Sequence, residues 1–295
     1  MSTRATWRHV ILAALGQRGA VARLLADTTP SLDEPAPLEL PADLLAASAE
    51  TPIVDLAAAL HKQGVTMLLR GAPGYPPALL RTLGGEQAPP VLFVQGEPAR
   101  LADPTPAVGF CGSRHASPRA LSVAAACAER LAAQGVNVVS GHAAGVDEAV
   151  HTAALRAGLT TLVLPEGILR FRLRGALAPL ARPDNLVVVS SFPPRLPWSV
   201  GNAMARNHLI CGLSGALIVI EAGDTGGTLA AGRAALAHGV PLFVVDFAPP
   251  AAPGNALLLA AGGVPLRRRP SGEPNLDAVL AAARALSPRD GAQIR

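Results

Sequence analysis

A chain of 295 residues that is 50% hydrophobic and 16% charged has the composition of a folded protein with a substantial core, not of a disordered segment. Its net charge of +4 is unevenly spread, because residues 101–270 carry 14 Lys/Arg against 9 Asp/Glu, whereas residues 1–100 carry 8 against 9. The larger segment therefore favours an anionic partner. We find no secretory signal pattern and no apolar run of membrane-spanning length, so a cytoplasmic location is the expectation.

The first 64 residues are predicted to form a small N-terminal helical domain. Apolar residues recur at helical spacing over Val10–Leu15 and over Leu44–Leu60, on either side of a proline-rich loop at residues 30–41. Two short strands are expected next, at Thr66–Leu69 and Pro90–Val94, with a helix between them.

From residue 107 onward, apolar runs without alternation are separated by helical windows. Such runs are typical of parallel strands buried on both faces, and the windows have the length that βαβ crossovers need. The sequence therefore predicts an α/β fold with a doubly wound, mostly parallel sheet over residues 65–270, then a C-terminal helical tail over 271–295 with one helix at Leu276–Leu286. The runs are AVGFC (107–111), VNVVS (136–140), TTLVLP (160–165), NLVVVSS (185–191), GALIVIE (215–221) and VPLFVVD (240–246).

Three cysteines, Cys111, Cys127 and Cys211, are too widely spaced for a metal site and form no paired framework, so we expect buried free thiols. His142 and His151 have no cysteine or carboxylate partner at metal-ligand spacing. We therefore expect neither zinc nor another cofactor.

Ligands of a doubly wound sheet bind beyond the carboxyl ends of its strands, which directs attention to the segment after each apolar run. Gly112, Ser113 and Arg114 follow the first run and lead into a helix that Ser117 is expected to cap, with Pro118 at its first position. Backbone N–H groups at the helix start and the Arg114 guanidinium can together hold a phosphate. The alternative is that the glycine and serine only make a tight turn.

Three further segments are expected to surround the same crevice. One of them contains the carboxylate of Asp147. This carboxylate is either catalytic or, in the interpretation we prefer, complements the helix dipole and makes local hydrogen bonds. No GxxxxGK[ST], complete GxGxxG or GxSxG motif occurs, so nucleotide hydrolysis, ordinary dinucleotide binding and serine hydrolysis lack their usual signatures. The segments contribute Ser140, Gly141, Gly145 and Asp147; then Asn202, Arg206 and Asn207; then Gly226, Gly227 and Thr228.

In order and spacing, these segments resemble the DprA/Smf family over residues 65–266. The resemblance implies an extended Rossmann-like fold and a non-catalytic protein that binds single-stranded DNA, protects incoming DNA, loads RecA in natural transformation (competence) and DNA recombination, and forms a homodimer. The matching pieces are Tyr75-Pro76-Pro77, PPVLFVQGE (89–97), GSRHASP (112–118), SGHAAGVDEAVHTAAL (140–155), Ser191–Pro194, GNAMARNHLICGLS (201–214), EAGDTGGTL (221–229) and Pro253-Gly254-Asn255.

By the same resemblance, the 112–114 turn contacts phosphate, the segment with Ser140, Gly141, Gly145 and Asp147 is the family's second loop, and Arg206 with Asn207 forms its basic helix. Such a site would hold the sugar-phosphate backbone, with little base preference and strong salt dependence. Base stacking needs an exposed aromatic ring. Phe171, between Arg170 and Arg172, is the candidate, and burial of its ring is the alternative.

Several positions depart from the family pattern. Its second loop usually reads SGLARGID, whereas here Ala144 stands at the arginine position and His142 at the leucine position. Its basic helix usually reads NFPRRNR, whereas residues 202–208 read NAMARNH. Two or three cationic contacts are thus missing, which predicts weaker DNA binding, and the RFRLR run at 170–174 is a candidate to offset the loss. The tail after residue 266 is expected to be too short for the winged-helix module of many relatives.

Two other functions stay open. Residues 225–228 weakly resemble the PGGxGT motif of nucleoside-monophosphate phosphoribohydrolases, which would make the protein an enzyme or sensor for a nucleotide-derived small molecule. The residues after Gly227 are Thr-Leu-Ala-Ala-Gly-Arg, without the glutamate that such an enzyme needs. The third possibility is a diverged scaffold protein that has lost DNA affinity together with the missing arginines.

Overall fold

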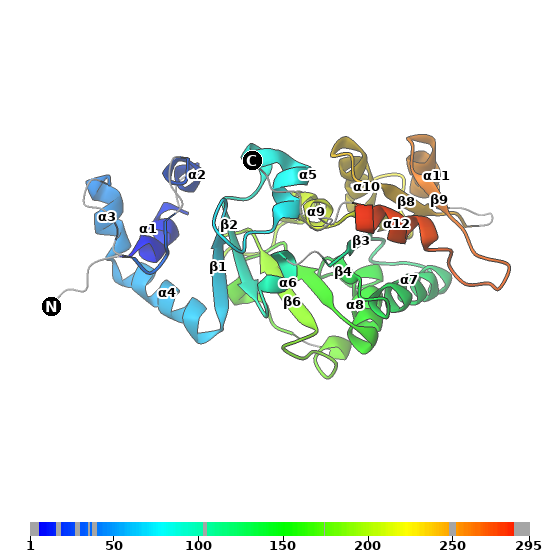
Figure 1. The fold of residues 1–295 in the computed structure, drawn as a ribbon, viewed down its shortest axis with the longest axis horizontal. Helices are drawn as coiled ribbons and strands as arrows, with labels where there is room; N and C mark the ends of the chain where they lie inside the picture. The colour runs from blue at the N-terminus through cyan, green and yellow to red at the C-terminus, as the bar shows by residue number, and fades with distance from the viewer. Residues whose placement is uncertain are drawn as a thin grey trace.

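Figure 1 shows the computed structural model, which describes residues 6–15, 19–26, 30–34, 36, 40–102, 105–173, 175–247 and 252–285. Parts of the predicted proline-rich loop (35 and 37–39) and the end of the predicted tail (286–295) lie outside these residues. The described strands are β1 Val65–Leu69, β2 Val91–Gln95, β3 Ala107–Cys111, β4 Asn137–Ser140, β5 Thr160–Val163, β6 Leu186–Ser190, β7 Ala216–Val219, β8 Leu242–Val245 and β9 Val264–Leu266.

The helices lie between and around these strands. Two short 3₁₀ segments, η1 Ile168–Arg170 and η2 Gly175–Leu177, follow β5. The α-helices are α1 Trp7–Ala14, α2 Ala20–Leu24, α3 Ala42–Ser48, α4 Thr51–Lys62, α5 Pro77–Gln87, α6 Ala99–Ala102, α7 Pro118–Ala132, α8 Val146–Ala157, α9 Val200–Gly212, α10 Gly227–Ala237, α11 Pro253–Ala260 and α12 Asp277–Ala285.

One sheet runs through the molecule in the strand order β1-β2-β6-β5-β4-β3-β7-β8-β9. All neighbouring strands from β6 to β9 are parallel, and β2 pairs antiparallel with both β1 and β6. The chain moves outward from β3 to β6 and then returns to place β7 on the other side of β3. Strand direction and connectivity therefore confirm the predicted α/β class with a mostly parallel sheet, and they create a topological switch point between β3 and β7.

Both faces of the sheet are covered, which is why the strands lack polar alternation. Val163 and Val189 point into a cluster with α5, α9, α10 and α11, which lie above the sheet in Figure 1. Phe110 and Ile218 point into a second cluster with α7, α8 and α12. Cys111, Cys127 and Cys211 are buried in these clusters as free thiols, as expected.

The N-terminal helices pack at the β1 end of the sheet. Ile11 and Leu60 are fully buried and belong to the same apolar cluster as Met67 of β1, Phe93 of β2 and Leu162 of β5. The short helices expected before residue 64 are present, and their core is continuous with one face of the sheet. The placement of a domain boundary at residue 64 stays a prediction.

The C-terminal part contains one expected helix and one strand that the sequence did not indicate. Helix α12 occupies 277–285 of the predicted 276–286. Strand β9 pairs with β8, but it has only three residues and Val264 is exposed, so it carries no apolar run. In the described part of the chain, no helix has the length and apolarity to cross a membrane.

The side chain of Asn255 in α11 joins the ends of β7 and β8. Its Nδ2 donates to the carbonyl oxygens of Ile220 (2.8 Å) and Val245 (2.9 Å), and its Oδ1 accepts from the N–H of Ala222 at 2.8 Å. The amide thus replaces the peptide hydrogen bonds that these strands lose where they diverge. The Pro253-Gly254-Asn255 piece therefore has a structural role.

Candidate nucleic-acid interface

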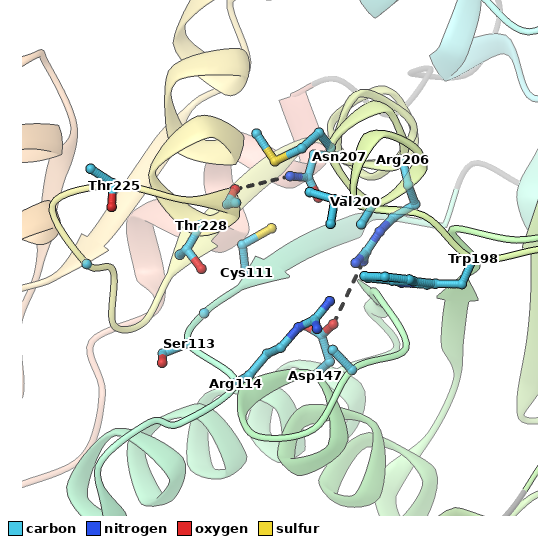
Figure 2. A pocket seen from close by; sticks show the side chains of 16 residues that line it. Cys111, Ser113, Arg114, Asp147, Trp198, Val200, Arg206, Asn207, Thr225 and Thr228 are labelled. Atoms are coloured by element: carbon cyan, nitrogen blue, oxygen red, sulfur yellow. Dashed lines mark hydrogen bonds and ion pairs between the residues drawn. The ribbon is translucent and has the colours of Figure 1, made fainter.

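A cavity of about 410 Å³ opens at the carboxyl ends of β3 and β7, at the switch point of the sheet (Figure 2). Its walls come from the loops after β3, β4 and β7 and from the first two turns of α9. We call this cavity the strand-end pocket. It is lined by Cys111, Gly112, Ser113, Arg114, Ala143, Asp147, Trp198, Val200, Ala203, Met204, Arg206, Asn207, Gly223, Thr225, Gly227 and Thr228.

Two glycines let the first two loops pack backbone to backbone. A Cβ at Gly112 would overlap the side chain of Val146. Gly145 has φ +79°, in the region that favours glycine, and a Cβ there would overlap the carbonyl of Ser113. The Val146 N–H donates to that same Ser113 carbonyl at 3.3 Å. These predicted site glycines shape the wall of the pocket; Gly145 itself stands behind it.

Arg206 and Asp147 form a charge pair in the wall of the pocket, and both side chains are nearly buried. Each residue is 7% exposed, and Arg206 Nη1 lies 3.8 Å from Asp147 Oδ2. Ser140, fully buried, donates from Oγ to Asp147 Oδ1 at 2.8 Å, so the structural interpretation of Asp147 agrees with its contacts. The guanidinium is only partly satisfied, because Arg206 Nε is buried and has no hydrogen-bond partner in the described structure.

A neutral histidine supports the loop beneath Arg206. His151 is fully buried, with Nε2 2.7 Å from the Gly141 carbonyl oxygen and Nδ1 2.8 Å from Thr160 Oγ1. Burial lowers the pKa of His151 to about 4, which Asp147 only partly opposes. The Gly141 carbonyl can only accept, so the neutral ring carries its hydrogen on Nε2 and donates it to Gly141. Thr160 Oγ1, which lies beside Nδ1, donates its own hydrogen to the Val138 carbonyl at 2.7 Å. The predicted Gly141 thus stands behind the pocket as a fixed support.

The exposed aromatic ring of this site is Trp198. Trp198 is 45% exposed and lines the pocket, and the Arg114 guanidinium carbon lies 5.6 Å from its ring centroid. Figure 2 shows the two side chains next to each other. Trp198 immediately precedes Ser199, whose Oγ accepts from the N–H of Asn202 (3.1 Å) and caps α9. The sequence contains this signal, a tryptophan before a helix cap, but nothing in it indicates that the ring is exposed.

Phe171 is not available for stacking, which corrects the first of the two interpretations of this ring. It is 7% exposed within the cluster shared by the N-terminal helices and the sheet, and its ring meets His142 edge-on at 5.2 Å. Arg172 donates from Nη1 to the carbonyls of Leu169 and Phe171 at 3.0 and 2.6 Å. Arg170 is exposed at the end of η1, and none of residues 170–172 lines the strand-end pocket.

The start of α10 forms the wall opposite Arg114. Gly227 and Thr228 line the pocket, and Asn207 Nδ2 donates to the Gly227 carbonyl at 3.1 Å. Gly226, with φ +93°, makes the turn into the helix. Asn202 donates instead to the Pro197 carbonyl at 3.2 Å, outside the pocket lining. The two asparagines thus fix loops, and only Asn207 reaches the pocket.

The start of α7 does not hold the free anion site that the sequence offered as one interpretation. Ser117 caps the helix as predicted, since Ala120 N donates to Ser117 Oγ at 3.2 Å. However, the carboxylate of Glu221 accepts from Ser117 N (3.2 Å) and Ser117 Oγ (2.6 Å). The helix dipole is already complemented by this carboxylate. An anion in the pocket is therefore expected beside Arg114 and Arg206.

Eight of the sixteen predicted site residues line the strand-end pocket, three support it from behind, two border it and three lie apart. The lining residues that sequence reasoning missed are mostly apolar or small, with no motif of their own. They are Cys111, Ala143, Trp198, Val200, Ala203, Met204, Gly223 and Thr225.

Comparisons with known proteins agree with this architecture. The chain is similar to the X-ray structure of DNA processing protein A from Streptococcus pneumoniae, with a TM-score of 0.66 at 22% identity over 90% of this chain and 95% of that chain. A structure of DNA processing protein A from Helicobacter pylori, described for its single-stranded DNA binding mode, gives a TM-score of 0.60 at 23% identity over 75% and 95%. These likenesses confirm the extended Rossmann-like fold.

Sequence comparison identifies the family. Protein Smf from Escherichia coli is 36% identical over 174 residues, which are 58% of this chain and 45% of that protein, so the chain spans less than half of this relative. The DNA processing protein DprA of Bacillus subtilis is 28% identical over 211 residues, 70% of this chain and 66% of that protein. The model of the family described as DNA recombination-mediator protein A matches residues 66–266, almost the range over which the motifs predicted the resemblance. The chain therefore belongs to the DNA recombination-mediator protein A family.

Proposed function

We propose that the strand-end pocket binds the sugar-phosphate backbone of single-stranded DNA, and that the protein is a DNA-processing recombination mediator that catalyses no reaction. The observation that carries this proposal is Arg206, a buried arginine whose Nε lacks a partner and whose counter-ion Asp147 lies 3.8 Å away. A phosphate oxygen entering the pocket would complete the hydrogen bonds of this guanidinium.

Arg114 supplies a second, accessible cation. It is exposed and lies over the Trp198 ring, so its guanidinium can meet a neighbouring phosphate while the ring offers its face to a base. Val200 and Met204, 67% and 38% exposed, extend the apolar side of the same pocket. Cationic groups beside an aromatic platform suit a single strand with splayed bases and little sequence preference.

The carboxylate within the described pocket lining is Asp147, and it is engaged by Ser140 and Arg206. A general base needs a free carboxylate in reach of the substrate proton, and Asp147 is already hydrogen-bonded and 7% exposed. This arrangement favours binding over the phosphoribohydrolase-like alternative.

Two cations in the described lining, Arg114 and Arg206, set the expected strength of binding. For a single strand, each neutralised phosphate contributes about −0.7 to the slope of log K against log salt, so we expect a slope of about −1.4. This small slope follows from the alanines and histidine that replace family arginines at positions 144, 205 and 208.

Fluorescence anisotropy with a labelled oligonucleotide tests the proposal over a salt series. We expect single-stranded DNA to bind more tightly than the duplex and Arg114→Ala to make the slope less negative by about 0.7. Arg182→Ala is the matched control, because Arg182 is exposed, pairs with Asp184 and lies outside the pocket. The proposed interface would be refuted if Arg114→Ala and Arg182→Ala lost the same amount of DNA affinity, or if the wild-type protein did not bind single-stranded DNA at low salt.

The proposal extends to the role of the family. We propose that the protein protects incoming DNA, forms a homodimer and loads RecA on single strands during natural transformation. Sedimentation velocity tests the dimer. Stimulation of RecA assembly on DNA coated with single-strand binding protein tests the loading role. If the protein bound single-stranded DNA but did not stimulate RecA assembly, the loading role would be refuted and the DNA-binding proposal would stand.

A further inference from the structure

Two histidines outside the strand-end pocket meet between α9 and α10. Nδ1 of His208 lies 2.9 Å from Nε2 of His238, with ring centroids 5.2 Å apart and planes inclined by 82°. His208 is exposed on α9, and His238 is half-buried at the C-terminal cap of α10. Packing of α9 against α10 fixes the two rings side by side.

Only one hydrogen fits between these nitrogens. When one ring donates, the other presents a lone pair, and a second proton in the contact would place two cations against each other. Neutral imidazole nitrogens are the form that binds metal ions.

The two nitrogens are close enough to become adjacent ligands of one metal ion. With metal–nitrogen bonds of about 2.0–2.1 Å, ligands at a right angle lie about 2.9 Å apart, and tetrahedral ligands about 3.3 Å. The observed 2.9 Å is the hydrogen-bond distance of the metal-free pair, and it leaves both nitrogens near enough to reach one ion once the His208 ring turns. Tetragonal coordination by nitrogen and oxygen is typical of Cu²⁺ and Ni²⁺, and Cu²⁺ binds such sites more tightly.

We propose that His208 and His238 form a two-histidine site for a divalent transition cation, with Cu²⁺ preferred over Ni²⁺ and both over Zn²⁺. To bind, the donating ring moves its hydrogen to its other nitrogen, and the exposed His208 ring turns until both lone pairs point to the ion. Water completes the coordination, since the described residues contain no cluster of three or more His, Cys, Asp or Glu side chains that could hold a metal.

The His208–His238 pair adjoins the strand-end pocket without lining it, because His208 directly follows the lining residue Asn207 on α9. Helix α10 begins at the pocket with Gly227 and Thr228 and is followed by His238, 11 residues further on, which at about 1.5 Å per residue separates the two ends by about 16 Å. Metal binding is measured without DNA, so its failure would not count against the proposed DNA interface. A metal ion bound by both histidines would also hold α9 and α10 together, and these two helices form part of the pocket wall.

Isothermal titration of the tag-free full chain with CuCl₂, NiCl₂ and ZnCl₂ provides the test. We expect one Cu²⁺ per chain and a Cu²⁺ signal in electron paramagnetic resonance with two coordinated imidazole nitrogens. His208→Ala and His238→Ala should each weaken Cu²⁺ binding at least tenfold. His61→Ala, which removes an exposed histidine of α4, is the matched control and should leave it unchanged.

If either His208→Ala or His238→Ala weakened Cu²⁺ binding less than tenfold, the assignment would be overturned. A Zn²⁺ affinity above that of Cu²⁺ would overturn it as well. His208→Asn provides a second variant in case the alanine disturbs α9, and circular dichroism melting confirms that each variant folds. NiCl₂ titration repeats the comparison with a redox-inert ion, so that thiol oxidation cannot imitate binding.

Discussion

The guanidinium of Arg206 occupies the space in which a side chain at position 141 would lie, so that Gly141 and Arg206 fit together only because Gly141 has no Cβ. We predict that Gly141→Ala displaces Arg206 and separates it from Asp147. Forcing a methyl group into a packed site costs about 1–3 kcal/mol of unfolding free energy. Urea denaturation measures this loss, and anisotropy should show weaker DNA binding.

Gly85→Ala is the control for this prediction, because a Cβ at Gly85 meets no neighbouring atom. If both alanine variants retained wild-type stability and DNA affinity, Arg206 would not depend on the gap at Gly141.

Trp198 is predicted to stack on a DNA base. Trp198→Ala should weaken single-strand binding by about 1–3 kcal/mol, the range for one stacked base, with little change in unfolding free energy because the ring is 45% exposed. Phe171→Leu should lower the unfolding free energy and leave DNA affinity unchanged, because Phe171 is buried. The protein has two tryptophans and Trp7 is buried, so DNA should quench the fluorescence of Trp198. Unchanged fluorescence and affinity would exclude stacking.

Glu221 is predicted to weaken anion binding by occupying the start of α7. Glu221→Gln removes one negative charge and keeps an oxygen that can accept from Ser117. A charge at a helix N-terminus is worth about 0.3–1 kcal/mol, so single-strand affinity should rise about two- to fivefold at low salt. Asp184→Asn, at an exposed site outside the pocket, controls for the change in net charge. An equal gain in both variants would assign the effect to net charge alone.

His151 is predicted to make stability depend on pH. Its folded-state pKa is about 4 and its unfolded value is 6.5, so the unfolded chain takes up the proton first as the pH falls. The contribution is present above pH 6.5 and is lost between pH 6.5 and 4, by about 3 kcal/mol in total. Denaturation at pH 7, 5.5 and 4 should show a smaller loss for His151→Gln. If the unfolding free energy of the wild type and of His151→Gln fell by the same amount between pH 7 and pH 4, His151 would not be the source of the pH dependence.

The sequence was informative wherever burial decides the structure. Strands β3 to β8 lie within the predicted apolar runs because both faces of these strands are covered, so their residues cannot alternate. β9 escaped prediction for the opposite reason, as an edge strand with exposed Val264 needs no apolar run.

The site was harder to predict because its decisive contacts join distant segments. Glu221 and Ser117 are 104 residues apart in the chain and meet only because β7 pairs with β3. Trp198 and Phe171 show the same limit, since the fold exposes one ring and buries the other, and composition does not distinguish them. Glycine spacing did locate the loops, because close backbone contact at Gly112 and Gly145 excludes every side chain.

The amide of Asn255 makes this end of the sheet sensitive to the replacement of a single nitrogen by oxygen. Its nitrogen faces two carbonyl oxygens and its oxygen faces an N–H group, in a position that is 2% exposed. Asn255→Asp would turn the nitrogen side into a carboxylate oxygen opposed to both carbonyls, at the point where β7 and β8 separate. A one-dalton change at this residue, with almost no change in size or shape, would therefore loosen the floor beneath the β7 loop.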